Sequence, residues 1–291
     1  MPYPKTEEHF LKGEDAQEIT DLKYVKSQEQ WKLVLNFNNG CKVYSEDGKR
    51  LLTFIKIAEK DSKFYKDASV QNYFQGITSV VSKTGKEVIC VGNSLGEVYF
   101  IDNVKEESYN NSVGISLKSG SPITYLASSN AHNLLFVGDT QGILHVCQVE
   151  SPQSGKLLKS IDLNNHNHPI TSMCVYENES VCYLFVGDLL GKIRVYDVLT
   201  YNMIIEIAAH FRAVTSLSVN LKLNRFISTS EDTYLNVWKV NVDNGLNLVL
   251  MKSYNSDDKM IMGGRILEKP KFNVMIAQYE CDEISVLTAL N

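Results

Sequence analysis

The chain has 291 residues, of which 44% are hydrophobic and 22% charged, as is ordinary for a globular protein. The formal net charge of −5 argues against a nucleic-acid partner, because binding to phosphate backbones requires a concentrated cationic surface. No apolar run approaches the roughly 20 residues of a membrane span, and residues 1–20 lack the apolar core of a secretory signal. Six cysteines without a CxxC pair are typical of reduced thiols, so we expect a cytoplasmic protein without membrane insertion.

The first predicted repeat unit lies near residues 19–58 and follows an N-terminal segment at 1–18. Its strands are predicted at 31–37, 41–44 and 51–57. The Asn39-Gly40 dipeptide separates the first two of them, and Asn-Gly favours a tight hairpin turn. The charged stretch at 59–67 is expected to form a long solvated loop before the next unit.

A strand, a tight turn and a second strand then recur, with the turns at Gly96, Gly142, Gly191 and Thr233. These positions are 46, 49 and 42 residues apart, and repetition at about 40–45 residues is the signature of a β-propeller with four-stranded antiparallel blades. The corresponding units are predicted near 76–119, 121–164, 168–208 and 212–254, with a weaker last unit near 258–288. Six repeats can therefore be counted in a single all-β domain over 1–291, which leaves six or seven blades open.

The last unit lacks room for a fourth strand, because its third predicted strand ends at Leu287, close to the end of the chain. The short segment at 9–12, His-Phe-Leu-Lys, is the candidate to complete it. An unpaired strand edge invites aggregation. We therefore predict that the propeller is closed by pairing of an N-terminal strand with the C-terminal unit.

One unit carries a more specific pattern, consisting of His210, a Ser-Thr-Ser strand, Asp232 and Trp238. Over about residues 76–254 the chain resembles the WD-repeat family, whose blades contain a hydrogen-bond chain of these residue types. The resemblance implies that His210, Asp232 and Trp238 join such a chain with either Ser228 or Ser230.

The other units depart from this pattern. In place of the tryptophan they carry Ile101, Cys147, Tyr196 and Leu287, and in place of the turn aspartate they carry Leu95, Gln141, Leu190 and Cys281. We therefore expect these blades to depend on apolar packing instead.

The resemblance also implies a docking face. In such propellers, the loops between consecutive blades share one rim with the turns between second and third strands, and this rim usually binds proteins. The predicted strands place the following residues there: His168, Leu189, Phe211, Arg212 and Tyr234. Two leucines in one tight turn are costly if they lie in water, so either Leu190 fills the place of the missing aspartate and leaves Leu189 exposed, or a partner covers the leucines. Arg212 and Tyr234 are of types enriched at interface hot spots, although such residues are often merely solvated.

No motif indicates catalysis or a cofactor, since the chain lacks GxxxxGK[ST], GxGxxG and HExxH. Residues 92–96 match GxSxG, but they form a turn between two predicted strands, whereas the nucleophile elbow of hydrolases leads from a strand into a helix. His166 and His168 lie two residues apart, but no third ligand lies near them in the sequence, so we predict no metal and no cofactor. A Ser/His/Asp triad stays open, because its members can come from distant positions.

The leading hypothesis is a non-catalytic scaffold or adaptor that displays loops to other proteins. The alternative is a stoichiometric subunit of a ciliary or microtubule-associated complex, where single-domain WD-repeat proteins are often found. A propeller hydrolase is a third hypothesis, which would require polar groups clustered at the mouth of a central channel. The fold class does not identify the partner, because one fold hosts many functions.

Removing residues 1–13 is expected to lower the melting temperature or to cause self-association, because it would delete the predicted closing strand. Thermal unfolding and size-exclusion chromatography of the truncated chain measure these two effects. Unchanged melting together with a monomeric elution profile would contradict the predicted closure.

Overall fold

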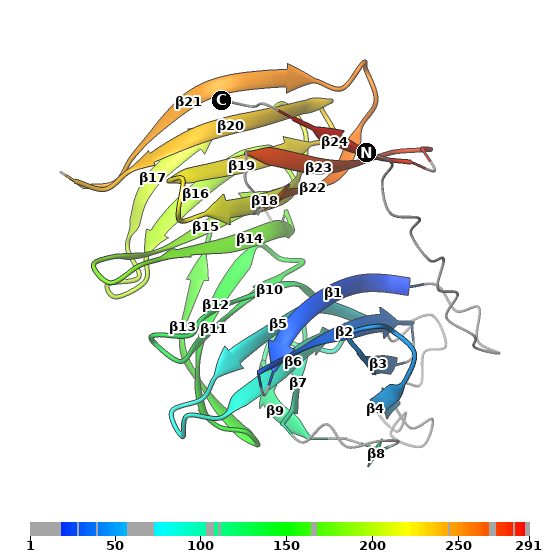
Figure 1. The fold of residues 1–291 in the computed structure, drawn as a ribbon. Coiled ribbons are helices and arrows are strands. Elements are labelled where there is room, and N and C mark those ends of the chain that lie inside the picture. Colours follow the sequence, from blue (N-terminus) through cyan, green and yellow to red (C-terminus); the bar gives the residue numbers. More distant parts are fainter. Residues whose placement is uncertain are drawn as a thin grey trace. The chain divides into compact units, whose positions relative to one another are not determined.

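The structure is a computed structural model that describes residues 19–27, 29–38, 40–56, 73–102, 108–109, 112–163, 168–243, 245–267, 272–281 and 283–288. Within these ranges the chain is all β, without a helix, and its strands form six sheets (Figure 1). None of these residues therefore belongs to a helix that could cross a membrane. The predicted closing segment at 9–12, the charged stretch at 59–67 and His166 lie outside the described residues.

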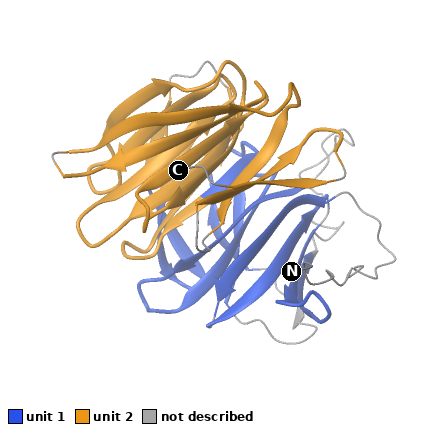
Figure 2. Ribbon diagram, turned by 45° about the horizontal axis from the view of Figure 1, so that its top comes forward, with its two compact units in different colours: residues 1–126, 147–158 blue, residues 127–146, 159–291 orange. Residues whose placement is uncertain are grey.

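Contacts divide the chain into two compact units (Figure 2). Unit 1 comprises residues 1–126 and 147–158, and unit 2 comprises 127–146 and 159–291. The division falls within strands of the third sheet, which consists of β10 (Ile123–Ser129), β11 (Leu134–Asp139), β12 (Ile143–Ser151) and β13 (Ser154–Asp162).

Unit 1 contains the first two sheets. The first consists of β1 (Ile19–Ser27), β2 (Gln30–Phe37), β3 (Gly40–Ser45), β4 (Leu51–Lys56) and β8 (Ser108–Tyr109). The second consists of β5 (Phe74–Val81), β6 (Glu87–Asn93), β7 (Glu97–Ile101) and β9 (Val113–Ser116). Two strands of the first sheet were absent from the predicted strands. β1 lacks a clean alternation of buried and exposed residues, and β8 is a two-residue strand that pairs in parallel with β4.

Unit 2 contains the last three sheets. The fourth consists of β14 (Ile170–Glu177), β15 (Cys182–Asp188), β16 (Lys192–Asp197) and β17 (Met203–Ala208). The fifth consists of β18 (Val214–Asn220), β19 (Arg225–Ser230), β20 (Tyr234–Asn241) and β21 (Asn247–Asn255). The sixth has three described strands, β22 (Ile261–Leu267), β23 (Asn273–Gln278) and β24 (Ile284–Leu287). Four of the six sheets have four strands, as predicted, while the first sheet gains β8 and the sixth has three described strands. In the fourth sheet each strand pairs antiparallel with the next along the chain.

The core lies on the middle strands, which are covered on both faces. Every residue of β15 is buried, whereas β17 at the edge of the same sheet has four of its six residues exposed. Between the fourth and fifth sheets, the rings of Phe185 and Phe226 lie 4.9 Å apart, centroid to centroid. Burying side chains of this size contributes roughly 1.5–3 kcal/mol each to the free energy of unfolding. A single sheet with both faces in water would not gain this stabilisation.

A glycine near the end of the second strand allows the next sheet to approach. A Cβ atom added to Gly187 would lie 2.7 Å from Val214 Cγ1, and one added to Gly138 would lie 2.8 Å from Ile170 Cγ2. Gly92 in unit 1 stands in the same relation to Ile123, at 2.6 Å. The β-branched residue that begins each following sheet therefore packs directly on a backbone that has no side chain.

Gly187→Ala is expected to destabilise the protein by about 1–3 kcal/mol, because the added methyl group would overlap Val214 in a packed core. The urea midpoint of unfolding measures the effect. Gly263→Ala is the matched control, since a Cβ atom there meets nothing within 4 Å. Equal loss in both variants, or no loss in Gly187→Ala, would contradict the close-approach argument.

Candidate functional site

The fifth sheet contains a buried chain of side-chain hydrogen bonds. His210 Nδ1 lies 3.0 Å from Asp232 Oδ2, and His210 Nε2 lies 2.8 Å from Ser228 Oγ. Trp238 Nε1 donates to the same Ser228 Oγ at 3.0 Å. Burial lowers the pKa of His210 below its ordinary value although Asp232 opposes the shift, so the imidazole is neutral near pH 7. Ser228, and not Ser230, is therefore the serine that links histidine to tryptophan.

Ser230 has a different task, which is to hold the loop at 209–213. Its hydroxyl donates to the carbonyl of Arg212 at 3.2 Å and accepts from the Asp232 amide at 3.1 Å. The Asn236 side chain donates to the Ala209 carbonyl at 2.9 Å. Both ends of the loop are thus bonded to the sheet that follows it.

Phe211 lies at the tip of this loop and is 97% exposed. Its amide donates to Asp232 Oδ2 at 2.9 Å, so the carboxylate that contacts His210 also fixes the backbone of the exposed residue. Because hydrogen bonds fix the backbone at Phe211, its side chain stays in solvent and does not pack into the core.

The turn of the preceding sheet lies against the same loop. The Gly191 carbonyl accepts from the amides of Ala209 and His210, both at 3.1 Å. Gly191 has φ +79°, and a Cβ atom there would lie 2.3 Å from the His210 carbonyl oxygen, so only glycine fits. The turn and the loop therefore form one continuous surface.

Leu189 and Leu190 both point outward from this turn, 41% and 44% exposed. The interpretation in which Leu190 fills the place of a missing aspartate is therefore wrong. Asp188 secures the turn instead, because its Oδ1 accepts from the Leu190 amide at 2.9 Å and from the Lys192 amide at 3.0 Å.

Arg212 and Tyr234 are exposed beside these residues, and Tyr234 follows the turn that Asp232 caps through a 3.0 Å bond to its amide. Together the exposed residues of these loops form what we call the Phe211 surface: Leu189, Leu190, Phe211, Arg212 and Tyr234. His168 is only half-buried and lies next to Pro169, whose carbonyl accepts from the Leu189 amide at 3.3 Å.

The repeats without the tryptophan pattern also contain buried polar bonds, so the expectation that they depend on apolar packing alone is wrong. Asp139 Oδ1 accepts from the Gln141 and Ile143 amides at 2.9 and 2.8 Å, and Asp139 Oδ2 pairs with His145 Nε2 at 3.2 Å. Asp188 Oδ2 pairs with Arg194 Nη1 at 2.7 Å. The sequence signal was present as Val-Gly-Asp, two residues before the position at which an aspartate was sought.

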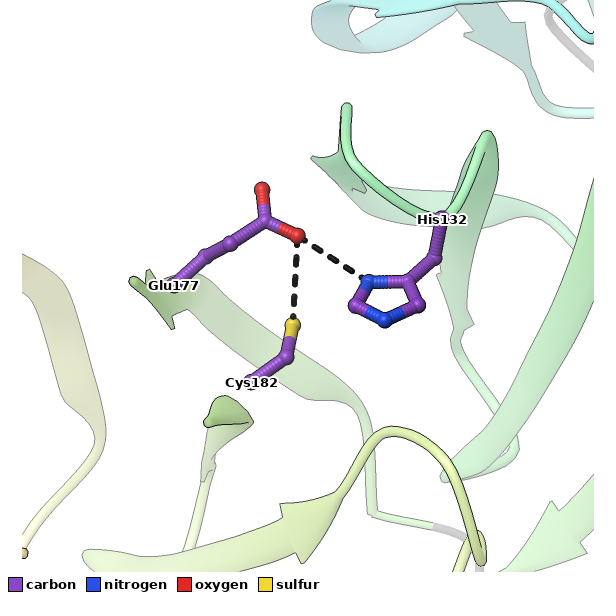
Figure 3. A group of neighbouring side chains, drawn as sticks. All are labelled: His132, Glu177 and Cys182. Atoms are coloured by element: carbon purple, nitrogen blue, oxygen red, sulfur yellow. Dashed lines mark hydrogen bonds and ion pairs between the residues drawn. The ribbon is translucent and has the colours of Figure 1, made fainter. Parts of the chain in front are cut away.

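A separate polar cluster joins Ser129, His132, Glu177 and Cys182 in unit 2. Figure 3 shows the last three of these side chains. Ser129 Oγ and Glu177 Oε1 both lie against the same ring nitrogen, His132 Nδ1, at 3.0 and 3.1 Å. A catalytic proton relay uses the two different nitrogens of the imidazole, so this is not the arrangement of a Ser-His-Glu triad. Sequence reasoning missed the cluster, because its members are far apart along the chain.

A sequence model of the family described as WDR54 matches residues 11–289. WD repeat-containing protein 54 of Mus musculus is 24% identical over 262 residues, which cover 87% of this chain and 73% of that protein. WD repeat domain 54 of Rattus norvegicus is also 24% identical, and WD repeat-containing protein 54 of Homo sapiens is 22% identical, with the same coverage.

Among solved structures, the β-propeller domain of Cps50 (Swd1) from Myceliophteria thermophila matches with a TM-score of 0.68. It is 11% identical, and the match covers 94% of this chain and 84% of that one. This likeness shows the fold, and it confirms the predicted β-propeller, with six blades in the described residues. Pairing of the N- and C-terminal strands stays a prediction.

Ser228→Ala is expected to destabilise the protein by about 1–3 kcal/mol, because it leaves the buried Trp238 and His210 nitrogens without their shared partner. Urea unfolding followed by tryptophan fluorescence measures the loss. Lys239→Ala, at an exposed position on β20 of the same sheet, is the control and should cost little. Superimposable unfolding curves for the two variants would show that the chain contributes nothing.

Proposed function

The chain belongs to the WDR54 family of WD-repeat proteins, and from this membership we propose that it is a non-catalytic scaffold that binds other proteins through the Phe211 surface. One observation carries the proposal, namely that Phe211 is 97% exposed on a loop whose backbone is bonded to its neighbours on both sides. The family and the propeller fold support the general role, and the residues of the surface support the choice of face.

An exposed aromatic residue on a fixed backbone suits an interface anchor. Binding orders the side chains and loops that it uses, and each immobilised side chain costs about 0.5–1.5 kcal/mol. Hydrogen bonds already hold the backbone of the loop at 209–213, so the cost of ordering the loop itself would be small. Arg212 and Tyr234 beside it are residue types that are enriched at energetic centres of interfaces.

The two leucines extend the anchor across the neighbouring turn. Leu189 and Leu190 leave apolar surface in water at a turn whose backbone Asp188 secures. A partner that covered them together with Phe211 would remove the apolar surface of three side chains from solvent, which contributes to affinity in proportion to the area buried.

The more specific alternative, a subunit of a ciliary or microtubule-associated complex, stays a prediction, as does a cytoplasmic or cytoskeletal location. A subunit of that kind would also dock on protein neighbours, so the Phe211 surface serves either role. Co-sedimentation with detergent-resistant microtubules separates the two roles, because a transient adaptor would remain in the supernatant.

Phe211→Ala is expected to reduce capture of the bound protein by about tenfold or more, since truncating a central aromatic anchor commonly costs at least 2 kcal/mol. Affinity capture from cells with quantitative mass spectrometry measures the loss. Leu199→Ala is the matched control, because Leu199 is a 65% exposed apolar residue on the turn between β16 and β17, outside the Phe211 surface.

Leu189→Asp, Arg212→Glu and Tyr234→Ala test the rest of the surface in the same way. All four surface variants should melt close to the parent, because each of the four positions is exposed and none contributes to the buried core. If Phe211→Ala and the parent captured the same proteins in the same amounts, the proposal would be contradicted.

A further inference from the structure

The cluster of Ser129, His132, Glu177 and Cys182 lies at the hairpin ends of two neighbouring sheets. Glu177 ends β14 and Cys182 begins β15, and the two are paired directly across the antiparallel ladder. His132 lies in the turn between β10 and β11. Figure 3 shows the imidazole and the thiol converging from these two hairpins on one carboxylate oxygen of Glu177.

The spacing of these atoms is that of ligands around one small ion. His132 Nδ1 lies 3.1 Å from Glu177 Oε1, and Cys182 Sγ lies 3.5 Å from the same oxygen. All three ligand atoms lie within 4.8 Å of one another. Tetrahedral Zn²⁺, with bonds of about 2.0 Å to nitrogen and oxygen and about 2.3 Å to sulfur, separates N from O by about 3.3 Å and S from O by about 3.5 Å.

The donor set selects among metals. A thiol, an imidazole and a carboxylate form a combination that suits Zn²⁺, whereas Mg²⁺ and Ca²⁺ prefer sites made of oxygen atoms. Burial raises the pKa of the Cys182 thiol to about 12, so without a metal it carries its proton. Coordination to a divalent cation removes such a proton, and zinc uptake would therefore release it.

The carboxylate supplies the charge that attracts a cation. Burial alone would raise the pKa of Glu177, but hydrogen bonds from the three neighbouring side chains and from the Ala131 backbone together outweigh burial and hold this pKa below its ordinary value. Glu177 is therefore ionised at neutral pH. Its bond from Ser129 would also orient it, as outer-shell hydrogen bonds orient metal ligands in proteins.

Access to the cluster is from one side. The Cys182 side chain is buried, whereas those of Glu177 and His132 are 21% and 31% exposed. An ion held by the three would therefore face solvent through the histidine and the carboxylate, and a water molecule could complete a tetrahedral shell there.

We propose that His132, Glu177 and Cys182 bind one Zn²⁺ ion through Nδ1, a carboxylate oxygen and Sγ, with water as the fourth ligand. The ion would tie the β14–β15 hairpin to the β10–β11 turn. The site is independent of the Phe211 surface and extends the role of the chain beyond protein docking. It also revises the expectation from sequence that the chain carries no metal site.

The test is metal titration of the purified full chain after treatment with a chelator. We expect one equivalent of Zn²⁺ per chain, a higher melting temperature with excess Zn²⁺, and a thiolate-to-metal charge-transfer band when Co²⁺ is added instead. Cys182→Ser should abolish that band, and Cys182→Ser and Glu177→Gln should each weaken Zn²⁺ binding at least about tenfold. Cys281→Ser is the matched control, because Cys281 is half-buried next to Lys259 and outside the cluster.

Metal-free melting curves show whether each variant is folded, and His132→Asn, at a partly exposed position, is a third ligand variant should one of the others unfold. Less than one equivalent of bound Zn²⁺, or a Co²⁺ complex without a thiolate band, would overturn the proposal. Equal binding by Cys182→Ser and Cys281→Ser would overturn it as well, and the cluster would then be a metal-free hydrogen-bond network.

Discussion

The close approach of one sheet to the next is the constraint on which the rest of the structure depends. At three places, the backbone of a glycine near the end of a second strand touches the β-branched side chain that begins the next sheet, as Gly187 touches Val214. Any side chain at the glycine would separate the two, because a Cβ atom would lie under 3.0 Å from its neighbour. The middle strands are buried because of this contact, since water is excluded from them only while the sheets pack at this distance.

The turns beside these glycines are organised by buried polar groups. Asp139 and Asp188 each accept two turn amides and pair with a cation or an imidazole on the next strand, while Asp232 does the equivalent task with His210. Removing one partner of a buried ion pair such as Asp188 with Arg194 leaves an uncompensated charge, so these bonds specify the turn geometry strongly. Asp232 and Asp188 therefore fix the backbone of the loop that carries Phe211 and of the turn that carries the two leucines.

The sequence predicted most of the fold, because the strands repeat an alternation of apolar and polar residues and the turn glycines show how many residues separate one sheet from the next. It also indicated three of the four residues in the buried chain and left two serines open, which the bonds of Ser228 resolve. The rest depended on distance along the chain. His132 and Glu177 are 45 residues apart, and Ser129 and Cys182 are 53 apart, so no local spacing connects them. β8 escaped notice because two residues that pair in parallel with β4 leave no periodic pattern.

The Asp232 carboxylate contacts both His210 and the Phe211 amide, so it links the exposed loop to the buried Trp238 through a series of hydrogen bonds. The fluorescence of Trp238 can therefore report on the loop. Of the two tryptophans, Trp31 is 48% exposed and Trp238 is buried at the far end of the same series of bonds. A ligand that displaced the Phe211 backbone would move Asp232, and through His210 and Ser228 it would alter the environment of the Trp238 indole. Occupancy of the outer loop could then be followed by intrinsic emission, with no dye attached to the protein.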